Sequence, residues 1–383
     1  MSKFSPLRAL GLASTLLLAA CGGSKEPLVI GVAGPMKAAN GQSVRMAAEL
    51  AVEEINRDGG VGGRTLELKV LDDDANESRG IEVARLMRGD PEVLAVVGHV
   101  GSAVSVKAAP IYNAEASDSV AGDPLVEISP ASSAPALTGA GPWSFRVTPT
   151  DLEFSPALAQ WAYGRLGSRK AAVLFVNDEY GQGVTSAFEA AFKREGGTVV
   201  SADPYLPAIL TEPAVLDPYL RRAITRGADA LVIGGQADAG VFIIRAARRL
   251  GYQGPILGSD GLTGIKDARG VGEGVFVSSA FLPDTRAEKA QGFVAKFRGR
   301  YNRNPDHRAA QTYDILFMLR DAIREGGADR EAIRAYLEWL GREGGAPAYE
   351  GVSGRIAFDE HGDVVKKPVI IGVVRGGELV TAR

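Results

Sequence analysis

The chain has 383 residues, a formal net charge of −3, 45% hydrophobic residues and 23% charged residues. This is a globular composition, and the length is sufficient for two domains with their own cores. The slight acidity and the lack of a long basic run exclude a nucleic-acid partner, which requires a basic surface. The single cysteine excludes an internal disulfide framework, and the three histidines, His99, His307 and His361, lack the spacing of a metal site.

The N-terminus has the pattern of a lipoprotein signal. A basic start precedes an apolar stretch over residues 10–18, which is too short to span a bilayer stably. The stretch ends in Leu18-Ala-Ala-Cys21, which resembles the lipobox of bacterial lipoproteins. An ordinary secretory signal with a chance cysteine is the alternative, and the avoidance of cysteine elsewhere argues against it. We therefore expect a signal peptide over residues 1–20, lipidation of Cys21, and a polar tether over residues 21–27.

After the tether, short apolar runs alternate with amphipathic helical patterns. In a first series, apolar runs typical of strands alternate with segments whose apolar residues recur at helical spacing. Gly59-Gly60 end the first of these helices. This β-α-β-α-β order predicts a parallel sheet covered by helices. We expect strands at residues 28–32, 66–71 and 94–97, and helices at 44–55 and 81–87.

A second series of the same kind begins after the break at Thr148-Pro149-Thr150. The chain then changes character, with three helices in a row followed by a β tail that turns at Gly376-Gly377 and returns to a sheet edge. Aromatic residues on these helices form stripes expected to face the core. The expected strands are 171–176, 199–200, 230–233, 255–257, 275–279, 355–358, 369–374 and 379–380; the helices are 184–192, 239–250, 290–301, 309–323 and 333–340; the aromatic residues are Phe293, Phe297, Tyr301 and Tyr313.

Several short segments, taken in order, resemble the Leu/Ile/Val-binding protein family, the type I periplasmic binding proteins of ABC transporters. Each segment alone is weak, but the ordered set covers the chain from about Leu28 to its C-terminus. The segments are Ile30-Gly-Val-Ala-Gly-Pro35, Ala51-Val-Glu-Glu-Ile-Asn56 with Gly59-Gly-Val61, Val96-Val-Gly-His99, Ile128-Ser-Pro-Ala-Ser-Ser133, Asn177-Asp-Glu-Tyr-Gly-Gln-Gly183 and Gly258-Ser-Asp-Gly261.

The resemblance implies an α/β fold with two doubly wound parallel-sheet lobes, joined by a three-strand hinge, and a ligand in the cleft between them. The three crossings are expected near Thr148, Ser279 and Ser353, where the sequence pattern also changes. Lobe 1 would comprise residues 28–148 and 280–353, and lobe 2 residues 149–279 and 354–383. The expected protein is a monomer.

On lobe 1 the candidate ligand-binding residues follow two expected strands. In open parallel sheets, ligands bind beyond the carboxyl ends of the strands. Ser102 lies past the strand 94–97 at the start of a helix, where its hydroxyl and the free amides suit a carboxylate, although an ordinary N-cap serine fits equally. The resemblance implies a hydroxyl ligand at Ser133 and a backbone carbonyl ligand at Ala131. Alternatively, Ser133 is only a polar residue that keeps the loop soluble.

On lobe 2, Asp260 stands in a glycine-flanked turn directly after the strand 255–257. Turn chemistry alone explains such an aspartate, but the resemblance implies the acidic partner of a ligand ammonium group. Tyr180, in the expected loop 177–183, would cover the ligand and donate a hydrogen bond. Gln236 and Asn40 stand where relatives carry cleft aromatics, so the resemblance supports an amino-acid frame better than it supports leucine.

Enzyme readings find little support, because G-x-S-x-G, P-loop and H-E-x-x-H motifs are absent. Asp72-Asp73-Asp74 reads as a solvated strand end, since three consecutive strand residues cannot face one metal ion. The resemblance implies a lipid-anchored extracytoplasmic substrate-binding protein of an ABC importer, without a cofactor. Its ligand would be a small amino acid, branched-chain or related, passed to permease subunits in the membrane. The alternative is a sensor of the same fold that signals the presence of amides, aromatic acids or amino acids.

Overall fold

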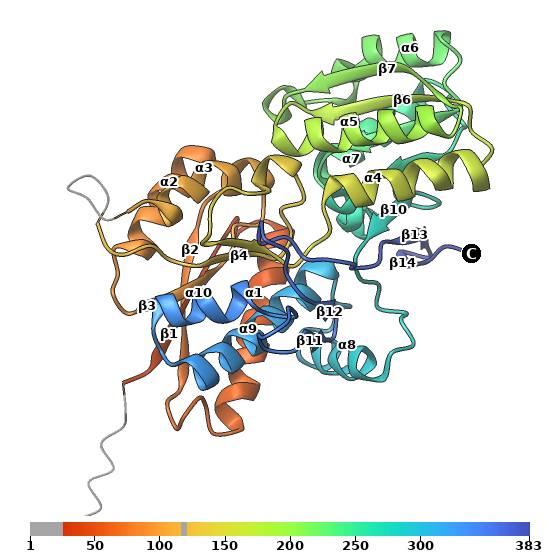
Figure 1. The fold of residues 1–383 in the computed structure, drawn as a ribbon. Helices are drawn as coiled ribbons and strands as arrows, with labels where there is room; N and C mark the ends of the chain where they lie inside the picture. The colour runs from red at the N-terminus through yellow and green to blue at the C-terminus, as the bar shows by residue number, and fades with distance from the viewer. Residues whose placement is uncertain (1–25, 116–120) are drawn as a thin grey trace, which may run out of the picture.

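The computed structural model describes residues 26–115 and 121–383, and in it the chain forms two lobes (Figure 1). The first lobe contains a five-stranded sheet in the order β2-β1-β3-β4-β5. All neighbouring pairs in it are parallel, as the alternating pattern predicts. Its strands are β1 (Leu28–Gly34), β2 (Leu66–Asp72), β3 (Val93–Val97), β4 (Glu127–Ser129) and β5 (Ser144–Arg146).

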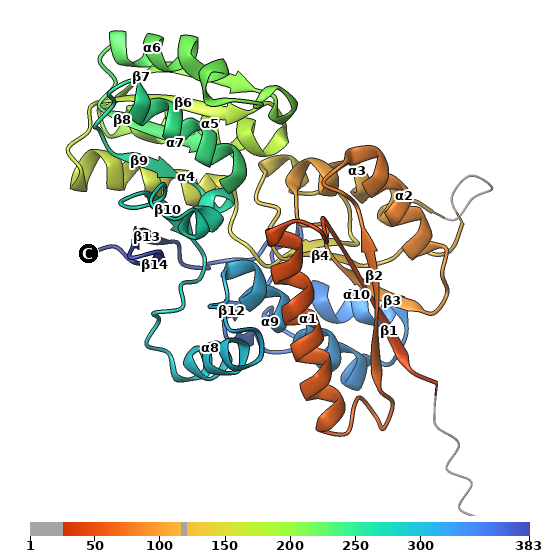
Figure 2. The same cartoon turned by 180° about the vertical axis from the view of Figure 1, so that it is seen from behind.

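Helices cover both faces of this sheet (Figures 1 and 2). One face packs in a large core that includes Phe293 and Phe297, which are 2% and 0% exposed, so the predicted aromatic stripe is confirmed. The other face packs in a smaller core around Met87 and Tyr112. The helices are α1 (Ala39–Arg57), α8 (Glu288–Tyr301), α9 (His307–Gly326) and α10 (Arg330–Glu338) on the first face, and α2 (Glu77–Arg88) and α3 (Ser102–Asn113) on the second.

The second lobe contains a seven-stranded sheet in the order β14-β13-β10-β9-β8-β6-β7. Five strands are parallel, and the C-terminal hairpin β13–β14 joins β10 in antiparallel fashion at the edge, as predicted. The strands are β6 (Lys170–Val176), β7 (Thr198–Tyr205), β8 (Ala230–Gly234), β9 (Ile256–Gly258), β10 (Phe276–Ser279), β13 (Ile370–Arg375) and β14 (Glu378–Thr381).

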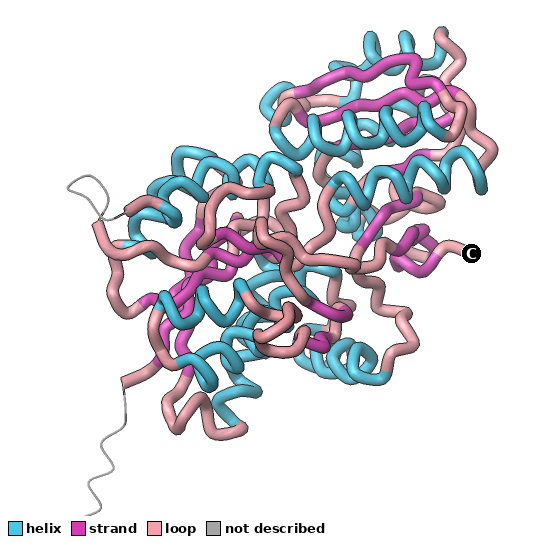
Figure 3. The backbone as a smooth tube through the Cα atoms, viewed as in Figure 1, coloured by secondary structure: helices cyan, strands magenta, loops and turns pink. Residues whose placement is uncertain are grey.

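Helices also cover both faces of the second sheet. Figure 3 shows that the chain passes between the lobes as loops. The helices are α4 (Asp151–Gln160), α5 (Glu179–Arg194), α6 (Asp217–Thr225) and α7 (Ala237–Arg249); shorter helical turns are η1 (Pro135–Leu137), η2 (Trp161–Arg165), η3 (Pro207–Ile209), η4 (Pro213–Leu216) and η5 (Asp260–Asp267). Among the helices of the described ranges, none is both long and apolar enough to cross a bilayer.

The third crossing between the lobes lies further along the chain than the sequence pattern suggests. Strands β11 (Tyr349–Gly351) and β12 (Gly354–Ile356) form a separate hairpin. Ile356, Phe358 and Val364 then pack in the core of the first lobe. Residues 354–364, which the sequence assigns to lobe 2, therefore pack with lobe 1, and the chain reaches the second sheet at β13.

The reading of Asp72-Asp73-Asp74 as a solvated strand end is wrong for its middle residue. Asp73 is fully buried, and its Oδ2 lies 2.7 Å from Nδ1 of His99. Nε2 of His99 in turn lies 3.2 Å from the hydroxyl of Tyr112. This buried chain of polar side chains joins the end of β2 to the loop after β3, and the partner lies 26 positions away, beyond the reach of a local sequence pattern.

Candidate functional site

The candidate site lies where the carboxyl ends of strands from the two sheets face each other. Ser102 follows β3, the loop 130–134 follows β4, Tyr180 follows β6 and Asp260 follows β9. The lobes touch around this point, because Lys107 Nζ of α3 lies 3.1 Å from Glu179 Oε1 of α5. Parallel sheets place ligand-binding groups at such strand ends.

The two predicted serines of lobe 1 lie on adjacent loops. Ser102 is the first residue of α3, and its hydroxyl accepts a hydrogen bond from the amide of Ala134 at 3.2 Å. This bond places Ser102 beside Ser133, which is completely buried, and near Ala131, which is 5% exposed. Gly101 precedes the helix and provides no side-chain cap, so the positive end of α3 faces the loop.

A buried arginine holds this loop in place. Arg146 Nη1 donates to the carbonyl oxygens of Ser132 at 3.3 Å and Ala134 at 2.7 Å, on either side of Ser133. Its Nε and Nη2 donate to Asp363 at 2.6 and 2.8 Å. Arg146 is 1% exposed, and its guanidinium group donates to the loop that carries Ser133 and to Asp363. It therefore joins this loop to the last segment that crosses between the lobes.

On lobe 2 the predicted pair Tyr180 and Asp260 is in contact. The Tyr180 hydroxyl donates to Asp260 Oδ1 at 3.1 Å and accepts from the amide of Gly261 at 2.8 Å. Asp260 is 2% exposed. Burial raises the pKa of Asp260, while the charge of Arg308 and the hydrogen bonds from Tyr180 and Ser259 offset part of that rise.

Two details of these predictions are corrected. Tyr180 is expected in a loop, but α5 starts at Glu179 because Asp178 caps it by accepting a hydrogen bond from the amide of Gly181 at 2.9 Å. Asp260 is not a residue of an open turn, because it begins the helical turn η5. Both side chains therefore lie at the start of a helical element.

Asp151, the first residue of α4, is a buried carboxylate near the site that no sequence pattern indicates. It is 0% exposed, and its carboxyl oxygens have no hydrogen bond of good geometry within the described residues. Burial and then the charge of Asp260 raise the pKa of Asp151 well above its usual value, while the nearby Ser133 hydroxyl lowers it. The capping box of Thr150 and Glu153 signals this helix start, although it does not reveal the burial.

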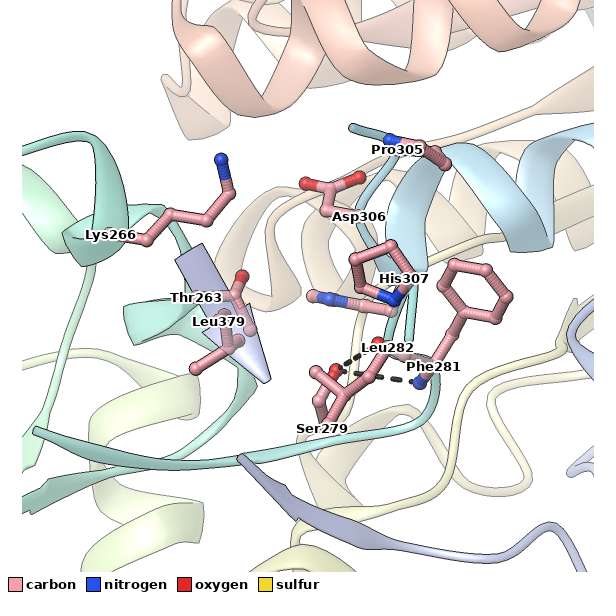
Figure 4. Close-up of a pocket in the computed structure, with 10 residues that line it drawn as sticks. Thr263, Lys266, Ser279, Phe281, Leu282, Pro305, Asp306, His307 and Leu379 are labelled. Carbon is pink, nitrogen blue, oxygen red and sulfur yellow. Dashed lines mark hydrogen bonds between the residues drawn. The ribbon is translucent and has the colours of Figure 1, made fainter. Parts of the chain in front are cut away.

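Sequence analysis also missed the start of α9, which faces Asp260 from lobe 1. His307 Nε2 lies 3.7 Å from Asp260 Oδ2, and Arg308 Nη2 donates to the Asp260 carbonyl at 3.4 Å. Arg308 Nη1 donates to the Thr263 hydroxyl of η5 at 2.9 Å. Figure 4 shows Asp306 and His307 opposite Thr263 and Lys266, which come from the other lobe.

Gln236 lies apart from the other predicted residues. It precedes α7, is half-buried, and lines a cavity of about 400 Å³ together with Asn40 of α1 and Arg308. The cavity reaches Gly261 and Thr263, which flank the Asp260 contacts. Gln236 and Asn40, the two positions where relatives are expected to carry aromatic residues, therefore line the same cavity next to Asp260.

The arrangement combines hydroxyls and a helix N-terminus on one lobe with buried carboxylates on the other. Within residues 26–115 and 121–383, no group of three His, Cys, Asp or Glu side chains is arranged to hold a metal ion. Cys21, the predicted lipidation site, lies outside the described residues.

The two lobes and the buried polar groups between them define a solute-binding protein of the periplasmic type. The sequence model of the periplasmic binding proteins matches residues 27–378, so the chain belongs to this family. A curated relative, Leu/Ile/Val-binding protein homolog 1 of Brucella abortus, is 25% identical over 360 residues, which cover 92% of each chain.

Solved structures agree with this membership. The leucine-binding protein LivK of Thermotoga maritima is 27% identical, with a TM-score of 0.81 over 93% of this chain and 98% of that chain. A substrate-binding protein of Desulfitobacterium hafniense in complex with Leu is 28% identical, with a TM-score of 0.77 over 94% and 100%. A solute-binding protein of R. palustris in complex with benzoate is 19% identical with a TM-score of 0.80 over 93% and 95%, which shows the shared fold alone.

Proposed function

We propose that this protein is the substrate-binding protein of an ABC importer, which closes its lobes around a small amino acid and delivers it to permease subunits. The observation that carries the proposal is the pair of buried polar groups at strand ends of the two lobes, with Ser102 beside the loop of Ser133 on lobe 1 and Tyr180 bonded to Asp260 on lobe 2. The complex of the Desulfitobacterium hafniense relative with leucine supports an amino-acid ligand.

In this proposal each end of the ligand is held by one lobe. Ser102, Ser133, the Ala131 backbone and the start of α3 hold the carboxylate without a formal positive charge, since amide and hydroxyl donors satisfy its oxygens. Asp260 holds the ammonium group, and the Tyr180 hydroxyl orients Asp260. Only a ligand with both groups bridges the cleft, so binding and closure are coupled.

Calorimetric titration with the twenty amino acids tests the proposal. Asp260→Asn keeps the shape but removes the charge, so we expect a loss of about 2–5 kcal/mol in binding free energy for the best ligand. Ser102→Ala removes one hydroxyl and should cost about 1–3 kcal/mol. Asp58→Asn is the matched control, because this carboxylate is exposed at the C-terminal end of α1 and does not line the cavity. Near-native affinity of Asp260→Asn contradicts the ammonium assignment.

The lipid anchor is a separate part of the proposal. A thioether-linked lipid on Cys21 would keep the binding protein at the membrane beside its permease. Cys21→Ser should release the protein into the soluble fraction and abolish labelling with a radioactive fatty acid. A membrane-bound and labelled variant contradicts the anchor.

A sensor of the same fold is the second candidate, because the fold alone does not distinguish transport from signalling. Uptake of the bound amino acid by cells that carry or lack this gene distinguishes them. Import that depends on the gene supports the receptor of a transporter. Unchanged import together with a lost transcriptional response supports the sensor.

A further inference from the structure

The cavity of about 400 Å³ beside Asp260 is lined by small residues and by large polar ones. Its described lining includes no leucine, isoleucine, valine, methionine or aromatic side chain. The larger side chains on the wall are instead polar or charged, among them Gln236, Lys266, Arg303 and Arg308. A branched aliphatic side chain placed there would bury polar groups without giving them partners, which costs free energy.

Arg308 is the most buried cation of that wall, at 4% exposure. Its Nη1 donates to Thr263 at 2.9 Å and lies 3.3 Å from Asp306, and its Nη2 donates to the carbonyl of Asp260 at 3.4 Å. The Nε–H is buried and has no acceptor among the described residues. The two terminal nitrogens of the guanidinium group are therefore held by partners, while Nε is a buried donor without one.

A fixed buried donor discriminates strongly between ligands. An oxygen atom of a ligand that accepts from Nε satisfies it, whereas a hydrocarbon leaves it unpaired. Sites built to hydrogen-bond a polar group reject analogues that lack the group far better than apolar pockets distinguish methylene groups. Because Asp306 and the polar contacts already balance the charge of Arg308, a neutral carbonyl oxygen and a carboxylate oxygen both suit this donor.

We propose that Arg308 determines specificity by donating its Nε–H to a carbonyl oxygen in the ligand side chain. The preferred ligand is then an amino acid with a side-chain carboxylate or carboxamide. This inference rests on the proposed function, since it adds a side-chain subsite to the same amino-acid site. It predicts discrimination against leucine, isoleucine and valine.

The test compares ligands of similar length and different polarity by calorimetric titration. Wild-type protein should bind glutamine or glutamate about 10- to 100-fold more tightly than norleucine. In Arg308→Met, which is unbranched and apolar, this ratio should fall to about 1. Comparison of glutamine with glutamate shows whether the acceptor is an amide or a carboxylate oxygen.

Two control variants separate specificity from simple closure. Thr263→Ala removes an acceptor that Arg308 uses across the cleft but keeps Nε, so all ligands should weaken together and the ratio should persist. Arg300→Met removes an exposed cation of α8 that does not line the cavity, and should leave the ratio unchanged. If Arg308→Met fails to fold, the wild-type ratio and the Arg308→Lys variant test the proposal instead. Arg308→Lys has no N–H group at the position of Nε, so its ratio should also fall.

The outcomes distinguish this inference from the proposed function. Tight binding of branched aliphatic amino acids, with a ratio that Arg308→Met leaves unchanged, overturns the side-chain subsite while the amino-acid function stands. Lack of binding by every amino acid overturns the proposed function, and the subsite with it. A lost ratio in Arg308→Met, kept in Thr263→Ala, supports both.

Discussion

At the scale of single residues, the candidate site contains two carboxyl groups that are buried away from water. Asp151 and Asp260 are both buried, and burial raises the pKa of each. A ligand ammonium group placed near them would favour their ionised forms. In the unbound protein the same two carboxylates oppose folding, a cost that proteins often accept at binding sites.

Asp151→Asn tests this trade-off. Because the folded-state pKa of Asp151 is raised above its unfolded value, the unfolded state loses its proton first as pH rises, and the folding stability falls over that range. Each unit of such a shift is worth about 1.4 kcal/mol. We expect the unbound variant to be more stable than the wild type at neutral pH in urea denaturation, and to bind the ligand more weakly. A variant that is less stable and binds normally contradicts this.

His307 should determine part of the acid sensitivity. Burial, and next the charge of Arg308, lower the pKa of His307 to about 3. Between that value and about 6.5 the unfolded state binds more protons, so stability should fall as pH falls through this window. His307→Phe should lose less stability between pH 7 and pH 4 in urea denaturation than the wild type.

His361→Gln is the control for the His307 experiment, because the His361 side chain is 52% exposed. It should follow the wild-type dependence on pH. An identical slope for His307→Phe and the wild type would show that another group causes the acid transition.

Local sequence signals located only part of this site. Ser102, Tyr180 and Asp260 could be found because each follows a recognisable buried strand, and the family resemblance gave them roles. Asp151 and Arg308 were missed because their importance comes from contacts between lobes. Arg308 approaches Thr263 across 45 positions of sequence, and a periodic pattern carries no information about such pairs.

At the scale of elements, the strand and helix series followed from apolar periodicity because buried parallel strands and amphipathic helices have different periods. The helices α4 and α6 were missed for physical reasons. Each is short, and Pro156 interrupts the pattern of α4, while α6 begins next to a proline. Strand β5 has three residues, fewer than a periodic signal requires.

The segment after β12 also supports the loop 130–134, through the buried ion pair of Arg146 and Asp363. Asp363→Asn removes the charge that compensates a guanidinium at 1% exposure. Loss of one partner of such a buried pair costs about 3–5 kcal/mol of folding stability. Ligand affinity should fall too, because Arg146 holds the carbonyls on both sides of Ser133. Denaturant unfolding and calorimetry measure the two effects.

An exposed ion pair provides the control for Asp363→Asn. Glu350 and Arg355 lie 3.9 Å apart on the hairpin β11–β12, with side-chain exposures of 74% and 48%. Glu350→Gln should change stability by at most about 0.5 kcal/mol, as surface substitutions do. Equal effects of the two substitutions would refute the supporting role of Asp363.

At the scale of the whole molecule, two partly exposed polar contacts cross between the lobes around the buried site. Lys107 of α3 lies 3.1 Å from Glu179 of α5, and Arg303 lies 3.8 Å from Asp267 of η5. These groups are partly exposed, so each contact contributes little energy. A ligand that fills the buried site can therefore shift the balance between open and closed forms.

Cross-linking across the cleft tests this motion. We replace Lys107 and Glu179 by cysteine in the Cys21→Ser background, which otherwise contains no cysteine. A short bifunctional thiol reagent is needed, because a direct disulfide requires Cα atoms about 4.4–6.8 Å apart, closer than long side chains ensure. Ligand should increase the cross-linking rate by favouring the closed form. The control pair Lys69→Cys and Asp90→Cys replaces a 2.6 Å contact within lobe 1 and should react at the same rate with and without ligand. Equal rates at the Lys107–Glu179 pair, with and without saturating ligand, would mean that the lobes do not close on binding.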